Sequence, residues 1–204
     1  MTLGQRNTNM SELNPDQSLN ELIQGNKRYA GTWPRHPHQS AARRKEVAQA
    51  QHPFACILSC SDSRVPPEII FDQGIGDLFV VRVAGNIADD AAIGSLEYAV
   101  ERLGTPLIVV LGHKRCGAVQ AAVSGGRARQ HLDSITKVIE PAVAIARKQP
   151  GDVVDNAVEA NVQVVVKQLG SSQPTLAELV KNGKLKIVGA TYDLDTGLIN
   201  LHRD

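Results

Sequence analysis

Short, almost uninterrupted apolar runs alternate along the chain with longer segments in which apolar residues recur at helical spacing. The apolar runs cover residues 54–59, 78–83, 107–111 and 185–192. Runs of this length that are apolar on both faces are typical of the central strands of a parallel sheet. Helical segments between such strands indicate helices packed on the sheet. The pattern therefore predicts an α/β fold with a central, mostly parallel β-sheet flanked by helices.

The segments between the strands carry the spacing and the capping residues of helices. We predict helices over residues 15–30, 40–51, 118–123, 132–147, 153–169 and 174–181, a short helix that starts after Val65, and a helix from Asp89 or Asp90 to about Leu103. The turn residues over 193–197 predict a hairpin, after which 198–202 returns as an antiparallel edge strand. We thus expect about four parallel strands plus one antiparallel edge strand.

The chain shows no internal repeat or linker, so residues 13–204 are expected to form a single domain. Residues 1–12 are polar and are expected to form a loose N-terminus. The two helices that precede the first strand could pack on their own sheet or on a partner subunit, and periodicity does not decide between these arrangements.

Composition narrows the classes of function. A net charge of +1 gives no reason to expect a nucleic-acid or membrane partner, and 3% aromatic residues disfavour a surface for stacking bases. The first 17 residues lack the apolar segment of a secretory signal, so a cytoplasmic location is expected. Three cysteines do not make a disulfide framework, and they indicate thiols kept for metal binding or catalysis in a reducing compartment.

Chemically reactive residues directly follow two of the predicted strands. The first strand runs into Cys60-Ser61-Asp62-Ser63-Arg64, and the third runs into Gly112-His113-Lys114-Arg115-Cys116-Gly117. Ligands of α/β sheets bind at the carboxyl ends of the parallel strands. We therefore expect Cys60, His113 and Cys116 to converge there. Two thiolates and an imidazole suit zinc, and three protein ligands leave the open fourth position that is typical of a catalytic site.

Asp62 stands two residues after Cys60 and is expected to face the same pocket. Its carboxylate has two possible roles, as a fourth ligand in a closed state or as a hydrogen-bond acceptor beside the metal. A bidentate pair with Arg64 would hold the carboxylate away from the metal. An ordinary surface salt bridge is the alternative for both residues. Cys56 lies inside the first strand and is expected to be a small core residue.

Several motifs, taken in order, resemble those of the β-class carbonic anhydrases. They are Cys-Ser-Asp-Ser-Arg at 60–64, Phe-Val-Val-Arg and Ala-Gly-Asn within 79–86, Glu-Tyr-Ala-Val at 97–100, Gly-His-Lys-Arg-Cys-Gly at 112–117, and the hairpin at 192–197. The match extends over nearly the whole chain from about Asn14. The resemblance implies one Zn²⁺ per chain, held by Cys60, His113 and Cys116. It also implies the reversible hydration of carbon dioxide to bicarbonate and a proton by zinc-bound hydroxide, with Asp62 accepting from that hydroxide while paired to Arg64.

The resemblance further implies a substrate pocket formed by Gln51, Phe79, Ala84, Tyr98 and Gly117. Gln51 matches a glutamine whose amide contacts the substrate from across a dimer interface. Gly117 matches a glycine whose backbone N–H can also contact the substrate. Tyr98 matches a tyrosine near a zinc thiolate, and Ala84 stands where valine is common, which widens the pocket. From the sequence alone, Phe79 and Tyr98 would equally suit the core, and Gln51 would suit the end of a helix.

The family divides into two site types, and one position separates them. The regulated type carries a tryptophan three residues before the first zinc cysteine, and an aspartate closes its zinc site. Ile57 occupies that position here. Together with Gln51 and Tyr98, it makes the sequence resemble the plant-like, non-regulated type, with an open zinc and Asp62 paired to Arg64. The family also implies a homodimer or a dimer of dimers, with the N-terminal helices on the partner subunit.

Three other functions are compatible with the same motifs. Relatives on this scaffold hydrolyse carbon disulfide or carbonyl sulfide with the same metal chemistry. A catalytically silent scaffold or bicarbonate-binding homologue would be favoured by the loss of a ligand or of the Asp–Arg pair, but all five residues are present. Cysteine redox chemistry would need an exposed thiol of low pKa with a resolving partner.

Overall fold

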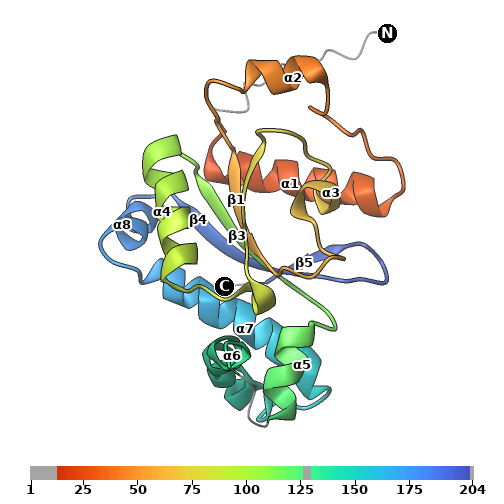
Figure 1. Ribbon diagram of the computed structural model, residues 1–204, viewed down its shortest axis with the longest axis vertical. Coiled ribbons are helices and arrows are strands. Elements are labelled where there is room, and N and C mark those ends of the chain that lie inside the picture. The colour runs from red at the N-terminus through yellow and green to blue at the C-terminus, as the bar shows by residue number, and fades with distance from the viewer. Residues whose placement is uncertain (1–12, 126–129, 203–204) are drawn as a thin grey trace.

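The computed structural model of the chain describes residues 13–125 and 130–202, and the predicted loose segment 1–12 lies outside the described residues. Its centre is a sheet with the strand order β2-β1-β3-β4-β5 (Figure 1). The strands are β1 (Ala55–Ser59), β2 (Leu78–Arg82), β3 (Leu107–His113), β4 (Lys186–Tyr192) and β5 (Ile199–Leu201). The first four are parallel and β5 pairs antiparallel with β4, which confirms the predicted fold class.

Helices cover both faces of this sheet (Figure 1). They are α1 (Pro15–Ala30), α2 (Ala41–Glu46), α3 (Pro67–Ile70), α4 (Asp90–Leu103), α5 (Gly117–Ser124), α6 (Leu132–Ala146), α7 (Val153–Gly170) and α8 (Thr175–Lys181). Successive strand residues point to opposite faces. Ile57 accordingly belongs to one apolar cluster with Leu22 of α1, and Leu58 to another with Leu96 of α4 and Val162 of α7. None of the helices in the described part of the chain combines the length and the apolar character that a membrane crossing needs.

Helix α1 packs against its own chain. Leu22 is fully buried, and the Asn26 side chain donates to the carbonyls of Ile70 and Gly197 at 3.2 and 2.8 Å and accepts from the N–H of Ile199 at 3.0 Å. These contacts join α1 to α3 and to β5. Helix α2, by contrast, buries none of its residues within the chain. Packing of the N-terminal helices on a partner subunit stays a prediction.

The predicted helix over 40–51 is wrong in its length. Ser40 caps α2 as expected, but the helix ends at Glu46 and residues 47–51 are not helical. A six-residue helix without buried side chains gains little from packing, and propensity alone does not sustain a longer one. Strand β3, in turn, extends to His113, two residues beyond the predicted 107–111, so His113 itself ends the strand.

Two glycines of the sheet face Val162 of helix α7. A Cβ atom at Gly112 of β3 would lie 2.6 Å from Val162 Cγ2, and one at Gly189 of β4 would lie 2.6 Å from Val162 Cγ1. Such distances are too short for two carbon atoms in contact. The glycines therefore let Val162 fit between β3 and β4, and α7 sits directly beneath the carboxyl ends of the strands.

Candidate metal centre

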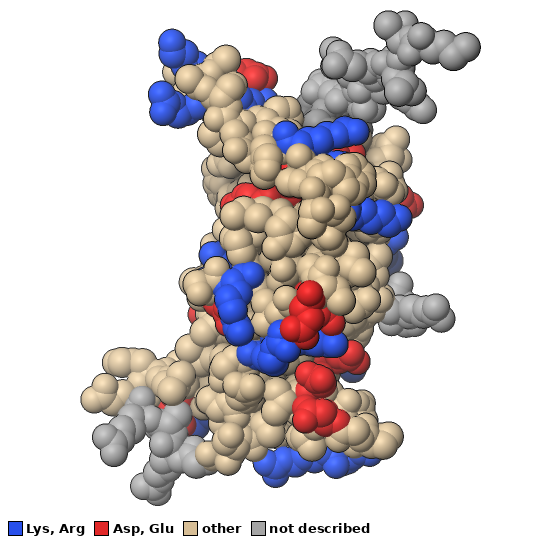
Figure 2. All heavy atoms as spheres, turned by 90° about the vertical axis from the view of Figure 1, so that its right-hand side faces the viewer, with Lys and Arg blue, Asp and Glu red and all other residues tan. Residues whose placement is uncertain are grey.

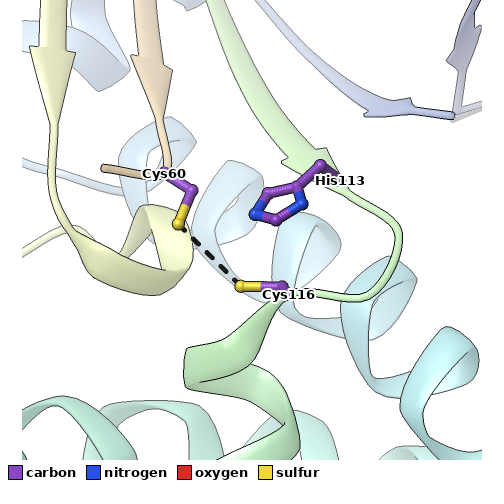
Figure 3. A group of neighbouring side chains, drawn as sticks. All are labelled: Cys60, His113 and Cys116. Atoms are coloured by element: carbon purple, nitrogen blue, oxygen red, sulfur yellow. Dashed lines mark hydrogen bonds between the residues drawn. The ribbon is translucent and has the colours of Figure 1, made fainter. Parts of the chain in front are cut away.

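Cys60, His113 and Cys116 meet at the carboxyl ends of β1 and β3 (Figure 3). The parallel register pairs Ser59 with Leu111, so the residues that follow the two strands emerge side by side. Cys116 comes from the loop after β3 and is the residue before the first turn of α5. The ligand atoms of the three buried residues lie within 4.8 Å of one another, and the two sulfur atoms are 3.9 Å apart. The structure thus brings the three predicted ligands together.

The imidazole of His113 is oriented as a ligand. Its Nδ1 lies 2.9 Å from the Lys114 carbonyl oxygen, which can only accept, so Nδ1 carries the proton. Nε2 is then an acceptor, and it is buried with no hydrogen-bond partner among the described residues. A buried acceptor left unpaired is unfavourable, and a cation between it and the two thiols would satisfy it. The set fits zinc, which takes soft sulfur and imidazole ligands.

The pKa values of the two thiols are shifted in opposite directions. The hydrogen bond with Cys116, aided by the backbone N–H of Gly85, lowers the pKa of Cys60 to about 4 even though burial opposes this. The pKa of Cys116 is raised, because it hydrogen-bonds to the Cys60 thiolate and is buried. A divalent cation between the two sulfur atoms would favour ionisation of both.

Backbone and guanidinium groups fix the loop that carries Cys60. The N–H of Gly85 donates to Cys60 Sγ at 3.2 Å, from the short 3₁₀ turn η2 (Ala84–Asn86). Arg82 at the end of β2 donates to the carbonyls of Cys60 and Asp62 at 3.0 and 2.6 Å. These supports were not among the predicted site residues. A charged residue at the end of an otherwise apolar strand was the available signal for Arg82.

Asp62 and Arg64 form the predicted bidentate pair. Arg64 Nε and Nη2 donate to the two carboxylate oxygens at 2.9 and 2.8 Å, and the Arg64 backbone N–H adds a third bond at 2.9 Å. These bonds hold the pKa of Asp62 well below its usual range. Asp62 Oδ2 is 3.8 Å from the unpaired Nε2 of His113. The carboxylate is therefore within reach of the ligand cluster but is turned toward Arg64.

Charged pairs connect the loop of His113 and Cys116 to the hairpin after β4. Lys114 Nζ lies 2.8 Å from Asp193, and the Arg115 guanidinium donates to both oxygens of Asp195 at 2.9 and 2.8 Å. Figure 2 shows basic and acidic side chains lying next to each other on this side of the molecule. The basic residues of the loop are thus engaged with acidic partners.

Two of the predicted pocket residues lie beside the ligands. Ala84 begins the turn whose next residue, Gly85, contacts Cys60, and Gly117 directly follows Cys116 as the first residue of α5. Both are small, so the ligand cluster is bordered by compact residues from its own chain.

The other three predicted pocket residues lie elsewhere in the chain. Phe79 pairs with Cys56 in the sheet, and Cys56 lies four positions, or about 13 Å of extended chain, before Cys60. Its ring is 6.3 Å from that of Tyr98, which is 50% exposed and so is not a core residue. Gln51 is exposed and precedes β1, at the opposite end of that strand from Cys60. One chain alone does not bring these three residues to its ligand cluster.

Comparisons with known proteins agree with this geometry. Residues 55–199 match the family model described as carbonic anhydrase. Carbonic anhydrase 2 of Mycobacterium tuberculosis is 42% identical over 92% of this chain and 93% of that protein. The carbonic anhydrase of Mycolicibacterium smegmatis is 41% identical over 94% of this chain and 95% of that protein.

Solved structures agree as well. A tetrameric β-carbonic anhydrase of Sordaria macrospora superposes with a TM-score of 0.73 and 27% identity, over 90% of this chain and 96% of that one. The Coccomyxa β-carbonic anhydrase in complex with acetazolamide gives a TM-score of 0.72 and 28% identity, over 90% of this chain and 85% of the other.

Proposed function

Because the chain belongs to the β-carbonic anhydrase family, we propose that it catalyses the reversible hydration of carbon dioxide to bicarbonate and a proton, with one Zn²⁺ per chain. The observation that carries this proposal is the buried cluster of Cys60, His113 and Cys116, whose ligand atoms lie within 4.8 Å of one another. The unpaired Nε2 of His113 supports it, since that atom has no other use in the buried cluster.

Two groups of residues have separate roles: the three ligands would hold the ion, and Asp62 with Arg64 would orient the water. Cys60, His113 and Cys116 would hold zinc, and the ion would supply Lewis-acid activation of water at neutral pH. Asp62 is kept ionised by its pair with Arg64. Its carboxylate would accept a hydrogen bond from the water at the fourth coordination position and so orient that water. With Ile57 in place of tryptophan, we propose the open, non-regulated site type, in which Arg64 holds Asp62 off the metal.

The pocket for carbon dioxide would be shared between two subunits. Ala84 and Gly117 lie beside the ligands of their own chain, and the Gly117 backbone N–H could donate to substrate oxygen. We propose that Gln51, Phe79 and Tyr98 complete the pocket of a partner subunit. Gln51 and Phe79 lie toward the amino end of β1, away from their own ligands, and the ring of Tyr98 lies beside that of Phe79. The exposure of Gln51 and Tyr98 in a single chain supports this arrangement.

This arrangement requires at least a homodimer, and a dimer of dimers would also satisfy it. The Sordaria macrospora structure is described as tetrameric. Light scattering on the active enzyme tests the point, and a clean monomer with full activity would contradict a partner role for Gln51. A cytoplasmic location stays a prediction.

Stopped-flow measurement of carbon dioxide hydration, combined with zinc analysis, tests the function. We expect about one zinc per chain in the wild type, and loss of both zinc and activity in Cys60→Ser. Cys56→Ser is the matched control, since Cys56 is a buried thiol inside β1 that belongs to the apolar cluster of Leu58 and not to that of Cys60. We expect it to keep both. Loss of zinc without loss of activity in Cys60→Ser would overturn the mechanism. A parallel assay of sulfide release from carbonyl sulfide distinguishes carbon dioxide from the alternative substrate.

A further inference from the structure

A buried amide lies on α7 beneath the candidate metal centre. Asn161 is 1% exposed, among apolar residues of that helix such as Val158, Val162 and Val165. Its Nδ2 donates to the carbonyl oxygen of Gly85 at 2.8 Å, while its Oδ1 has no partner among the described residues. Burial of an amide that is only half satisfied is unfavourable. Packing alone therefore does not explain a buried amide at this position.

Gly85 links this amide to a metal ligand. Its carbonyl accepts from Asn161, and its own N–H donates to Cys60 Sγ at 3.2 Å. Gly85 has φ +72 and ψ +17, a left-handed conformation that glycine adopts readily but does not hold by itself. A Cβ there would lie 2.7 Å from Ile139 Cδ1, so a stiffer residue does not fit. The orientation of the Gly85 N–H must therefore be fixed from outside, and Asn161 contacts the adjoining peptide.

We propose that Asn161 is a positioning residue of the metal centre, which holds Gly85 so that its N–H donates to Cys60 Sγ. The inference rests on the proposed function, since it concerns the residues that would hold the zinc. A hydrogen bond to sulfur withdraws electron density from the thiolate, and such outer contacts tune metal sites. With this bond in place, Cys60 donates less strongly and the bound ion remains a better Lewis acid.

A matched contact on the same helix distinguishes a positioning role of Asn161 from a purely structural one. Gln168, seven residues further along α7, donates through Nε2 to the carbonyl of Ala88 at 2.9 Å. Both amides thus join α7 to the segment after β2. Only the peptide held by Asn161 adjoins the N–H that contacts a ligand. Gln168→Ala therefore removes a hydrogen bond between α7 and the segment after β2 while leaving the contact to Cys60 Sγ in place.

The experiment compares cobalt-loaded wild type, Asn161→Ala and Gln168→Ala. We expect the sulfur-to-cobalt charge-transfer band to shift to longer wavelength in Asn161→Ala, because a thiolate without its N–H partner is more electron-rich. We expect no shift in Gln168→Ala, and circular dichroism establishes that each variant is folded. An unshifted band in Asn161→Ala, or an equal shift in both variants, would overturn the proposal.

A second measurement uses the wild type alone and does not depend on the folding of a variant. In ¹¹³Cd-loaded protein, the hydrogen bond to sulfur should give a through-bond correlation between cadmium and the Gly85 amide proton. Its absence from the wild type would overturn the inference while leaving the proposed function standing. A wild type that binds neither cobalt nor cadmium would overturn both.

Discussion

Asp195 accepts two parallel hydrogen bonds from Arg115 and so joins the hairpin after β4 to the loop between two candidate metal ligands. Arg115 lies between His113 and Cys116, and its φ of +54 falls in the left-handed region that residues other than glycine rarely adopt. Its carbonyl also accepts from Arg64 Nη2 at 3.2 Å. The exposed ion pair is expected to add little to global stability, but it holds this loop in an unfavourable backbone conformation.

Loss of the pair should therefore weaken retention of the metal more than it weakens the fold. In Arg115→Ala the backbone strain persists without the restraint, and we expect zinc transfer to a chelator to be faster by roughly fivefold, equivalent to about 1 kcal/mol of strain. Arg115→Gly loses the same pair but adopts positive φ without strain, so its release rate should stay closer to that of the wild type. Equal release rates for the two variants would contradict this explanation.

Removal of the Arg64 guanidinium should let Asp62 reach the metal. We expect the crystal structure of zinc-loaded Arg64→Ala to show Asp62 on the ion even at alkaline pH, with hydration activity lower by roughly 10- to 100-fold, as is common for contacts outside the ligand shell. Arg64→Lys keeps the charge but cannot make the bidentate pair, so its hydration activity should lie between that of the wild type and that of Arg64→Ala. A wild-type structure at clearly alkaline pH with Asp62 bound to zinc would rule out the open site type.

Asp193 should make the fold sensitive to acid. The hydrogen bond from Lys114, with backbone N–H groups of Asp195 and Thr196, lowers the pKa of Asp193 to about 2. A carboxyl whose pKa is lowered on folding stabilises the native state above its ordinary pKa near 4, and this contribution is lost as pH falls from about 4 toward 2.

Thermal unfolding of the wild type and Asp193→Asn across pH measures this contribution. The variant should be less stable at pH 7, and the difference in melting temperature should shrink as pH falls below 4. A difference that stays constant down to about pH 2 would show that the ionised carboxylate is not responsible.

The contact between Val162 and Gly189 should behave as a coupled pair. Gly189→Ala places a Cβ against a stiff, branched side chain, and we expect it to lower the free energy of unfolding by about 1–3 kcal/mol. Val162→Ala removes that obstacle, so the double variant should lose less stability than the sum of the two single variants. Denaturant unfolding of all four proteins gives the coupling energy, and strict additivity would contradict the predicted clash.

Local signals account for the parts of the fold that could be predicted. Helix α1 spans the predicted residues because Asn14 and Gln17 form a reciprocal capping box at its start and Pro15 occupies its first turn. The buried strands were evident from their continuous apolar runs. The predicted helix over 40–51 is too long because none of the residues of α2 is buried within the chain, so packing adds little to its stability.

The residues of the site also fall into those that the sequence predicts and those that only the folded structure brings together. The three ligands and the pair of Asp62 with Arg64 follow strand ends in the sequence, so topology alone brings them together. The supports come from residues far along the chain: Asn161 contacts Gly85 across 76 positions and Asp195 contacts Arg115 across 80. No periodicity or local motif connects such pairs, because their contact depends on how α7 and the hairpin dock on the sheet.

The parallel pairing of β1 with β3 would couple binding of the proposed zinc ion to folding. Cys60 and Cys116 are 56 residues apart, and closing so long a loop in an unfolded chain is entropically unfavourable. The unfolded chain can therefore offer little more than the local pair of His113 and Cys116, whereas the native sheet offers all three ligands. An ion that binds the native state more tightly than the unfolded state shifts the folding equilibrium by mass action. A higher concentration of free zinc would then raise the folded fraction of this protein, as well as the fraction that carries the proposed ion.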